Sequence, residues 1–378
     1  MRITNFSILF IALNLFLFSS GSLAQQKFQK IIEASYETGP LISNGKDWAD
    51  EVKDLVTYRG ADIRIGWRKV SEDFYQQLHR YPTYGVGLSM AVPYYTEIGQ
   101  PMGVYGFGEF PMSRNGIYKK FNLSYYAQIG LGFGLNPYDS LENPLNQYIG
   151  SELNAYIHFG FKANYQLSDR FGLFSTLGLK HYSNGSAKKP NAGINLAPLA
   201  IGIRYNLDQN RLPERSEIDY PPLEKRGFWN IAAYLGYKNY DIGAPTYFRG
   251  GLGVNYLWQA SYKYKIGLGL DMFFAPGYES RNPGEPGTFE NQTSLAIVGS
   301  WEWNLTDKIY MPIALGTYLH RNTENQELSI YERIGVRYRF DKHLFAGVQI
   351  KAHKAKADFF EFTVGYTIPG KVKSIVNQ

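Results

Sequence analysis

Apolar and polar residues alternate with a period of two along most of this chain. A representative stretch places Ile63, Ile65 and Trp67 at one parity and Asp62 and Arg64 at the other. In an extended strand this period puts one set of side chains on each face. The period of 3.6 residues that marks an amphipathic helix is almost absent. The pattern therefore predicts an all-β protein whose strands each have one apolar and one polar face.

The alternation divides into sixteen segments, in two sets of eight. The first set is expected at 29–41, 59–70, 84–94, 102–112, 120–135, 147–167, 171–183 and 194–207. The second set is expected at 228–240, 246–258, 262–274, 289–305, 308–320, 328–340, 344–353 and 358–368. Residues 208–226 between them carry three prolines among several charges and show no alternation, which is typical of an aqueous linker.

The N-terminus and the strand lengths favour a membrane protein. Residues 1–24 contain Arg2, an apolar run from Ile8 to Phe18 and the small-residue site Ser22-Leu23-Ala24, which predicts a cleaved secretory signal peptide. No later segment offers the roughly 20 continuous apolar residues of a spanning helix. Several alternating segments instead run for about 12 residues, long enough to cross a bilayer as tilted strands. Any membrane contact must therefore come from strands.

Composition supports a bacterial outer-membrane barrel. The chain has 31 Tyr, 24 Phe, 6 Trp and 39 Gly. This composition is typical of membrane barrels, which have girdles of aromatic residues and glycine-rich strands. We therefore predict transmembrane antiparallel β-barrels, most simply two eight-stranded barrels in tandem over residues 25–207 and 227–378. One sixteen-stranded barrel is the alternative. The absence of cysteine excludes a disulfide framework, a thiolate nucleophile and a lipoprotein anchor. The formal net charge of +6 is too mild to indicate a nucleic-acid partner.

One hairpin carries candidate chemistry. His181 and Ser183 share the parity of the apolar residues of their strand, and Asn195 shares the apolar parity of the following strand. All three side chains are therefore expected on the lipid-facing wall, with His181 opposite Asn195 or Ala197. A polar group that faces lipid is costly without a partner. A histidine and a serine two residues apart on one face can act as base and nucleophile. Alternatively, the three residues lie at the headgroup level, where polar side chains are tolerated.

The same residues resemble a known active site. The His-x-Ser-Asn motif at 181–184, the loop with Pro190-Asn191-x-Gly193 and a polar residue fourteen positions after His181 resemble the catalytic hairpin of the PagL-type outer-membrane lipid A deacylases, which are related to acyloxyacyl hydrolases. The resemblance covers the hairpin closely and extends plausibly over residues 25–207. It does not extend in an obvious way over residues 227–378, whose role the sequence leaves open.

The resemblance implies an esterase that removes an ester-linked acyl chain from lipid A, the membrane anchor of lipopolysaccharide. Ser183 would be the nucleophile and His181 the general base. Asn184 and the backbone of Gly185 would be oxyanion donors. The family has a glutamate where this chain has Asn195, and an amide can orient an imidazole but cannot stabilise its cation by charge. No metal or other cofactor is implied.

Two further expectations concern partners. Lys188 and Lys189 in the outer loop are candidates to contact lipid A phosphates, although solvated loop lysines are as good an interpretation. Association with a second copy of the chain is left open. The competing functional hypothesis is a non-catalytic porin or surface scaffold that retains the hairpin as a relic.

Overall fold

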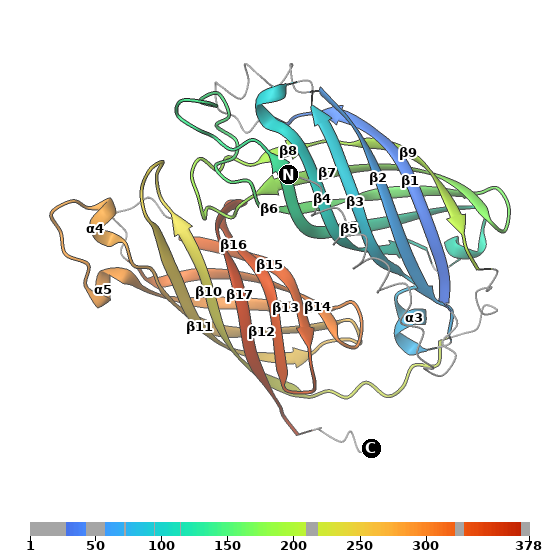
Figure 1. Ribbon diagram of the computed structural model, residues 1–378. Coiled ribbons are helices and arrows are strands. Elements are labelled where there is room, and N and C mark those ends of the chain that lie inside the picture. Colours follow the sequence, from blue (N-terminus) through green and yellow to red (C-terminus); the bar gives the residue numbers. More distant parts are fainter. Residues whose placement is uncertain are drawn as a thin grey trace.

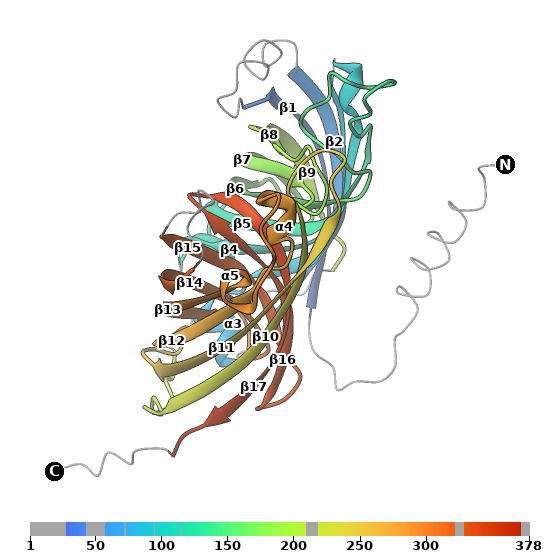
Figure 2. The ribbon, with the colours of Figure 1, turned by 90° about the vertical axis from the view of Figure 1, so that its left-hand side faces the viewer.

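The computed structural model describes residues 28–42, 57–71, 73–93, 95–113, 115–208, 218–321 and 329–371. The predicted signal peptide, residues 1–24, lies outside these ranges, as does half of the predicted linker. The described part of that linker, residue 208 and residues 218–226, contains neither helix nor strand. Figure 1 shows two separate barrels, with residues 218–226 leading into the second one, and Figure 2 shows both barrels from the side. Among the described residues no helix has the length and apolar character needed to cross a membrane.

The first barrel is closed and has eight strand positions, the last of which is divided into two short strands. Its strands are β1 (Phe28–Pro40), β2 (Thr57–Lys69), β3 (Thr83–Pro93), β4 (Gly99–Pro111), β5 (Phe121–Leu135), β6 (Asn154–Gln166), β7 (Phe171–Ser183), β8 (Ile194–Leu196) and β9 (Leu199–Asn206). Each strand from β1 to β7 pairs with the next, and β9 pairs with both β7 and β1, which closes the ring. The short helices α3 (Phe74–Leu78), η1 (Thr96–Ile98) and η2 (Gly116–Tyr118) lie between strands.

Pro198 explains why the eighth strand of this barrel is divided into β8 and β9. Proline has no N–H to donate to the ladder, but the Gly178 N–H still donates to the Pro198 carbonyl at 3.2 Å. The pairing register with β7 is the same on both sides, since His181 lies opposite Asn195 and Leu177 lies opposite Leu199. The break therefore removes a ladder hydrogen bond without shifting the register, and the barrel stays closed.

The second barrel is also closed and eight-stranded. Its strands are β10 (Gly227–Asn239), β11 (Thr246–Gln259), β12 (Tyr264–Phe274), β13 (Thr293–Asn304), β14 (Ile309–His320), β15 (Ile330–Arg339), β16 (Leu344–His353) and β17 (Lys356–Pro369). β10 pairs with β17 to close the ring. Helices α4 (Tyr278–Arg281) and α5 (Phe289–Gln292) lie between β12 and β13. The prediction of two eight-stranded barrels is confirmed, and the sixteen-stranded alternative is wrong.

Two predicted strands begin too early. Residues 147–153 form a loop, because Tyr148 and Ile149 are buried against the first barrel's aromatic cluster instead of continuing β6. Residues 289–292 form α5, because Thr288 begins a helix there with a capping box in which its side chain and that of Asn291 bond each other's backbone N–H groups. The helix cap thus determines the structure of residues 289–292, although their sequence continues the alternation of the following strand.

The two faces of each wall differ as a membrane barrel requires. The outer faces expose apolar side chains, and the largest exposed fractions on the strands include those of Ile201, Leu268 and Phe161. One end of the barrels has the four-residue turns 167–170, 260–263, 305–308 and 340–343, together with the connections 70–82 and 112–120 of the first barrel. The opposite end carries the longer loops 136–153 and 275–292. We assign the end with the longer loops to the cell exterior, as in other bacterial barrels of this kind.

Ion pairs and aromatic rings fill the first barrel's interior. The carboxylates of Glu33 and Glu109 are buried with three cations, Arg64, Lys162 and Arg204. Each cation contacts both carboxylates, at distances from 2.5 to 3.0 Å. These five residues come from five different strands, so the network ties the wall together across the lumen. Barrels of eight strands have interiors that side chains can fill.

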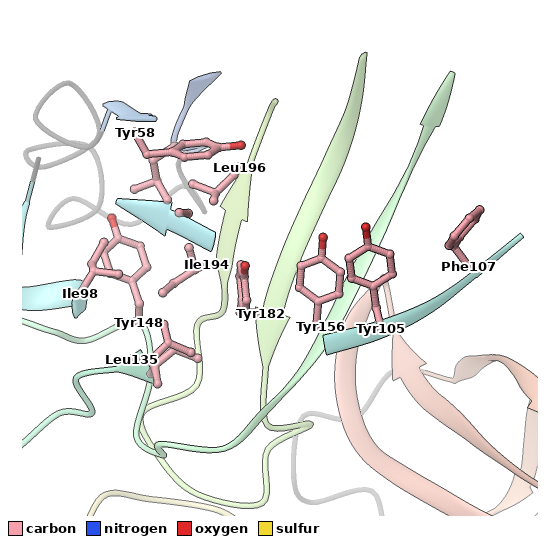
Figure 3. Packing of buried hydrophobic residues seen from close by; sticks show 13 residues of the cluster. Tyr58, Ile98, Tyr105, Phe107, Leu135, Tyr148, Tyr156, Tyr182, Ile194 and Leu196 are labelled. Carbon is pink, nitrogen blue, oxygen red and sulfur yellow. The ribbon is translucent and has the colours of Figure 1, made fainter. Parts of the chain in front are cut away.

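Tyrosines pack the outer half of this interior. Figure 3 shows Tyr182, Tyr156 and Tyr105 in a row, with adjacent ring centroids 5.3 Å apart. The Tyr105 hydroxyl lies 2.7 Å from both carboxylate oxygens of Asp62. The cluster supports the inner side of the wall directly behind the candidate hairpin, because Tyr182 lies between His181 and Ser183.

Tyr105→Phe should destabilise the first barrel by about 2 kcal/mol, because it leaves a buried carboxylate without its hydroxyl donor. Tyr182→Phe is the matched control, since the Tyr182 hydroxyl has no hydrogen-bond partner among the described residues. Denaturant unfolding of the folded barrel in detergent measures both variants. Equal stability of the two variants would contradict the assigned role of the Tyr105 hydroxyl.

Candidate active site

The β7–β8 hairpin brings the three candidate residues together. His181 on β7 is paired with Asn195 on β8, and Ser183 follows two residues later on the same face as His181. The His181 Nε2 atom lies 2.8 Å from Ser183 Oγ. The His181 Nδ1 atom lies 2.7 Å from Asn195 Oδ1. The side chains thus form a continuous hydrogen-bonded chain in the order serine, histidine, asparagine.

The chain of hydrogen bonds defines the proton positions. The Asn195 oxygen can only accept, so the His181 Nδ1–H donates to it. His181 Nε2 then carries the lone pair and accepts from the Ser183 hydroxyl. This tautomer is the one in which histidine can take a proton from serine. The arrangement is chemically equivalent to a nucleophile, a base and an orienting residue.

The site lies at the outer end of an apolar wall. Phe159, Leu179 and Leu199 surround it toward the membrane centre and expose 50%, 42% and 51% of their surfaces. Ser183 itself is only 2% exposed, although it shares their face. A lipid chain lying along this wall would bring a bond near its headgroup to the level of Ser183. The geometry therefore suits a substrate that stays in the bilayer.

A tight turn follows the serine. The Ala187 N–H donates to the Asn184 carbonyl at 3.2 Å, and the two central residues, Gly185 and Ser186, have φ angles of 61° and 65°. Positive φ at both central positions is characteristic of a type I′ turn, in which glycine is favoured. The backbone N–H groups of Asn184 and Gly185 thus follow the nucleophile directly in the chain, at the start of this turn.

Asn184 is engaged in holding this turn. Its Nδ2 group donates to Ser151 Oγ at 2.8 Å and to the Lys188 carbonyl at 2.9 Å, and its backbone N–H donates to Asn191 Oδ1 at 3.0 Å. Both side-chain hydrogens are thus used, which disagrees with the expectation that Asn184 serves as an oxyanion donor. The Gly185 N–H has no acceptor among the described residues, so it is the donor that is available to an oxyanion.

Two family models match the chain. Residues 61–204 match the model described as lipid A 3-O-deacylase (PagL), and residues 227–371 match the model described as acyloxyacyl hydrolase, C-terminal domain. The chain belongs to the PagL family of lipid A deacylases. It is accordingly an ester-hydrolysing enzyme of the bacterial outer membrane that deacylates lipid A. The deacylase resemblance over the first barrel is confirmed by the first model, and the second barrel matches a separate family model of its own.

Other comparisons add little to the PagL assignment. No curated protein matches the chain. Similar solved structures include a mutant of the Rh. blastica porin, at 8% identity, TM-score 0.16 and coverage of 91% of this chain and 100% of that one. An outer-membrane channel from Pseudomonas putida F1 is 8% identical, with TM-score 0.20 and coverage of 93% and 98%. CdiB from Acinetobacter baumannii is 9% identical, with TM-score 0.19 and coverage of 92% and 61%.

A second loop supports the PagL-type hairpin, and sequence reasoning missed it. Ser151 accepts the hydrogen bond from Asn184, and the Tyr148 carbonyl accepts from the Gly193 N–H at 3.0 Å. Ile149 also forms a β-bridge with Asn191. Alternation predicts a strand over residues 147–167, so it does not indicate these loop contacts. The polar residues at the end of this loop are the one sequence feature that could have indicated its contact with the hairpin.

The two loop lysines have different surroundings. Lys188 is exposed, whereas Lys189 is half-buried. The pKa of Asp139 is lowered chiefly by hydrogen bonds from the backbone N–H groups of Glu142 and Leu141, and Lys188 adds a smaller electrostatic contribution. Lys188 is therefore an exposed cation that is accessible to a lipid headgroup.

Gly193→Ala should lower activity by about 10²-fold, an effect of the size expected when a catalytic group is displaced by an ångström. A Cβ at this position would lie 2.7 Å from Cε1 of His181, and its φ of +78° disfavours any side chain. Gly284→Ala is the control, because it also has positive φ but no atom within 4 Å of the added Cβ. Initial rates on detergent-solubilised lipid A measure the effect. Parent-like activity in Gly193→Ala would contradict the tight packing of His181.

Proposed function

We propose that this protein removes an ester-linked acyl chain from lipid A with Ser183 as nucleophile, His181 as general base and Asn195 as the residue that orients the imidazole. The observation that carries the proposal is the hydrogen-bonded chain of these three side chains on the lipid-facing wall. The family models support the reaction class, and the name of the first one favours the 3-O position.

The reaction follows from the geometry in two balanced steps. His181 Nε2 takes the Ser183 proton as Oγ bonds to the ester carbonyl carbon, and the proton then passes to the departing sugar oxygen as the ester bond breaks. Water next attacks the acyl-serine, giving a fatty acid and regenerating Ser183. The Gly185 N–H is the candidate donor to the oxyanion of both tetrahedral intermediates. Lys188 and Lys189 are proposed contacts for lipid A phosphates.

The division of the chain follows the same proposal. Residues 25–207 form the catalytic barrel, residues 208–226 the linker and residues 227–378 the second barrel, with residues 1–24 removed on export. The porin alternative is disfavoured because buried ion pairs and aromatic side chains fill the first barrel. In the second barrel, Arg333 bridges Asp271 and Glu361 across the interior at 2.8 and 2.6 Å. Pairing of two copies stays a prediction.

Mass spectrometry of lipid A tests the reaction. Cells that express the protein should contain lipid A lacking one ester-linked acyl chain, together with the released fatty acid. Cells with the empty vector should retain the chain. Lipid A that is identical in the two strains, with the protein folded in the membrane, would contradict the proposed reaction.

A further inference from the structure

The turn that follows Ser183 touches the second barrel. The Ser186 hydroxyl donates to the Ala357 carbonyl at 3.2 Å, and the Asn239 N–H donates to the Ser186 carbonyl at 2.7 Å. The Thr246 hydroxyl donates to the Ala187 carbonyl at 3.0 Å. These contacts come from the first residues of β17 and β11 and the last residue of β10, all at the outer end of the second barrel. Figure 1 shows the loops of the first barrel meeting the second barrel there.

Phe360 on β17 packs against the same turn. A Cβ built on Gly185 would lie 2.2 Å from Cδ2 of Phe360, so the aromatic ring lies directly against the glycine backbone. Gly185 and Ser186 are both buried, although the central residues of a hairpin turn normally face solvent. The second barrel is thus what covers the residues after the nucleophile on this side.

The backbone of the turn depends on such support. Ser186 has a φ of +65°, a left-handed conformation that residues other than glycine rarely adopt. Conformations of this kind persist where surrounding contacts hold them, and they cluster at functional sites. Both polar groups of Ser186 named above, the hydroxyl and the carbonyl, are bound by the second barrel. Loop 136–153 holds the other side of the turn through Ser151 and Asn184.

We infer that the second barrel clamps the turn at residues 184–187, and that Phe360 and Thr246 are positioning residues that hold the Gly185 N–H beside Ser183. This inference rests on the proposed function, because the clamp acts on the oxyanion side of that site. It assigns to residues 227–378 a role in the same reaction. No residue of the second barrel needs to touch the reacting atoms.

Kinetic constants separate positioning from substrate contact. A looser turn weakens stabilisation of the transition state but leaves the binding of lipid A unchanged, so kcat should fall while KM stays constant. Loss of a side chain that contacts the acyl chain would instead weaken the binding of lipid A and raise KM. The inference therefore predicts an effect on kcat alone.

The test compares full-length variants of the second barrel in detergent or lipid. Phe360→Ala is expected to lower kcat about tenfold and Thr246→Val about threefold, with KM within twofold of the parent. Phe362→Ala is the matched control, since Phe362 exposes 56% of its surface on the same face of β17. Thr246→Ser retains the hydroxyl and should restore the parent rate. Parent-like kcat in both Phe360→Ala and Thr246→Val, or a rise in KM alone, would overturn the inference.

A second readout does not depend on catalysis. The chain has no cysteine, so Lys188→Cys provides a single attachment point for a spin label at an exposed position of the loop. The label should become more mobile in the Phe360→Ala background and stay unchanged with Phe362→Ala. Equal mobility in the two backgrounds would overturn the clamp.

The two readouts distinguish the possible failures. If the parent protein does not deacylate lipid A, the proposed function fails, but label mobility still tests the clamp. If Ser183→Ala is inactive and Phe360→Ala matches Phe362→Ala in both kcat and mobility, the catalytic site stands and the clamp fails.

Discussion

Replacing Ser183 with alanine is expected to lower the rate of lipid A deacylation by about 10⁴-fold, because no other nucleophile can form the acyl intermediate. Ser183 is the only hydroxyl within hydrogen-bonding distance of His181 among the described residues. The change removes one oxygen atom from a buried side chain, so the hairpin and the barrel should persist. Lipid A binding should stay close to that of the parent.

Ser175→Ala is the matched control for this prediction. Ser175 lies on β7 with the same parity as Ser183 but opposite Ile201, far down the strand from His181. Purified protein and fatty-acid release from lipid A give the rates. Activity of Ser183→Ala comparable to that of Ser175→Ala would exclude Ser183 as the nucleophile.

Asn195 is expected to have the second largest effect. Asn195→Ala should lower kcat by about 10³-fold, because the His181 Nδ1–H loses its acceptor and the imidazole is free to adopt the unproductive tautomer or turn away. Asn195→Asp keeps the oxygen in nearly the same place and adds a charge that stabilises the imidazolium. It should raise kcat, by about tenfold.

The Asn195 series is measured as kcat at saturating lipid A, with folded protein confirmed for each variant. The order aspartate, asparagine, alanine from fastest to slowest supports the orienting role. Equal rates for asparagine and alanine would show that Asn195 does not orient the base. A slower aspartate variant would show that charge at this lipid-facing position costs more in desolvation than it contributes to the transition state.

Strand periodicity was sufficient to predict much of the site. The shared parity of His181, Ser183 and Asn195 follows from counting along two strands, and the observed register places His181 opposite Asn195, one of the two partners expected. Alternation also located the strands of both barrels to within a few residues, apart from the early starts at 147 and 289. The reason is that the lipid and the filled lumen impose opposite polarity on successive residues.

Contacts made by loops and between barrels could not be predicted in this way. Ser151 and Tyr148 support the hairpin from a loop with no periodic constraint, and Ser186 meets Ala357 across 171 positions of sequence. Pairing inside the lumen was equally inaccessible, because alternation shows that Glu33 points inward but does not identify its partners. Such contacts depend on the three-dimensional arrangement of the closed barrels and their loops.

The most direct test of the catalytic account is covalent labelling of the folded protein with a fluorophosphonate, a reagent that reacts with base-activated serines. Peptide mapping by mass spectrometry should locate the adduct on Ser183, and labelling should be lost in His181→Ala but retained in Ser175→Ala. An adduct on a different serine, or undiminished labelling of Ser183 without His181, would contradict the account.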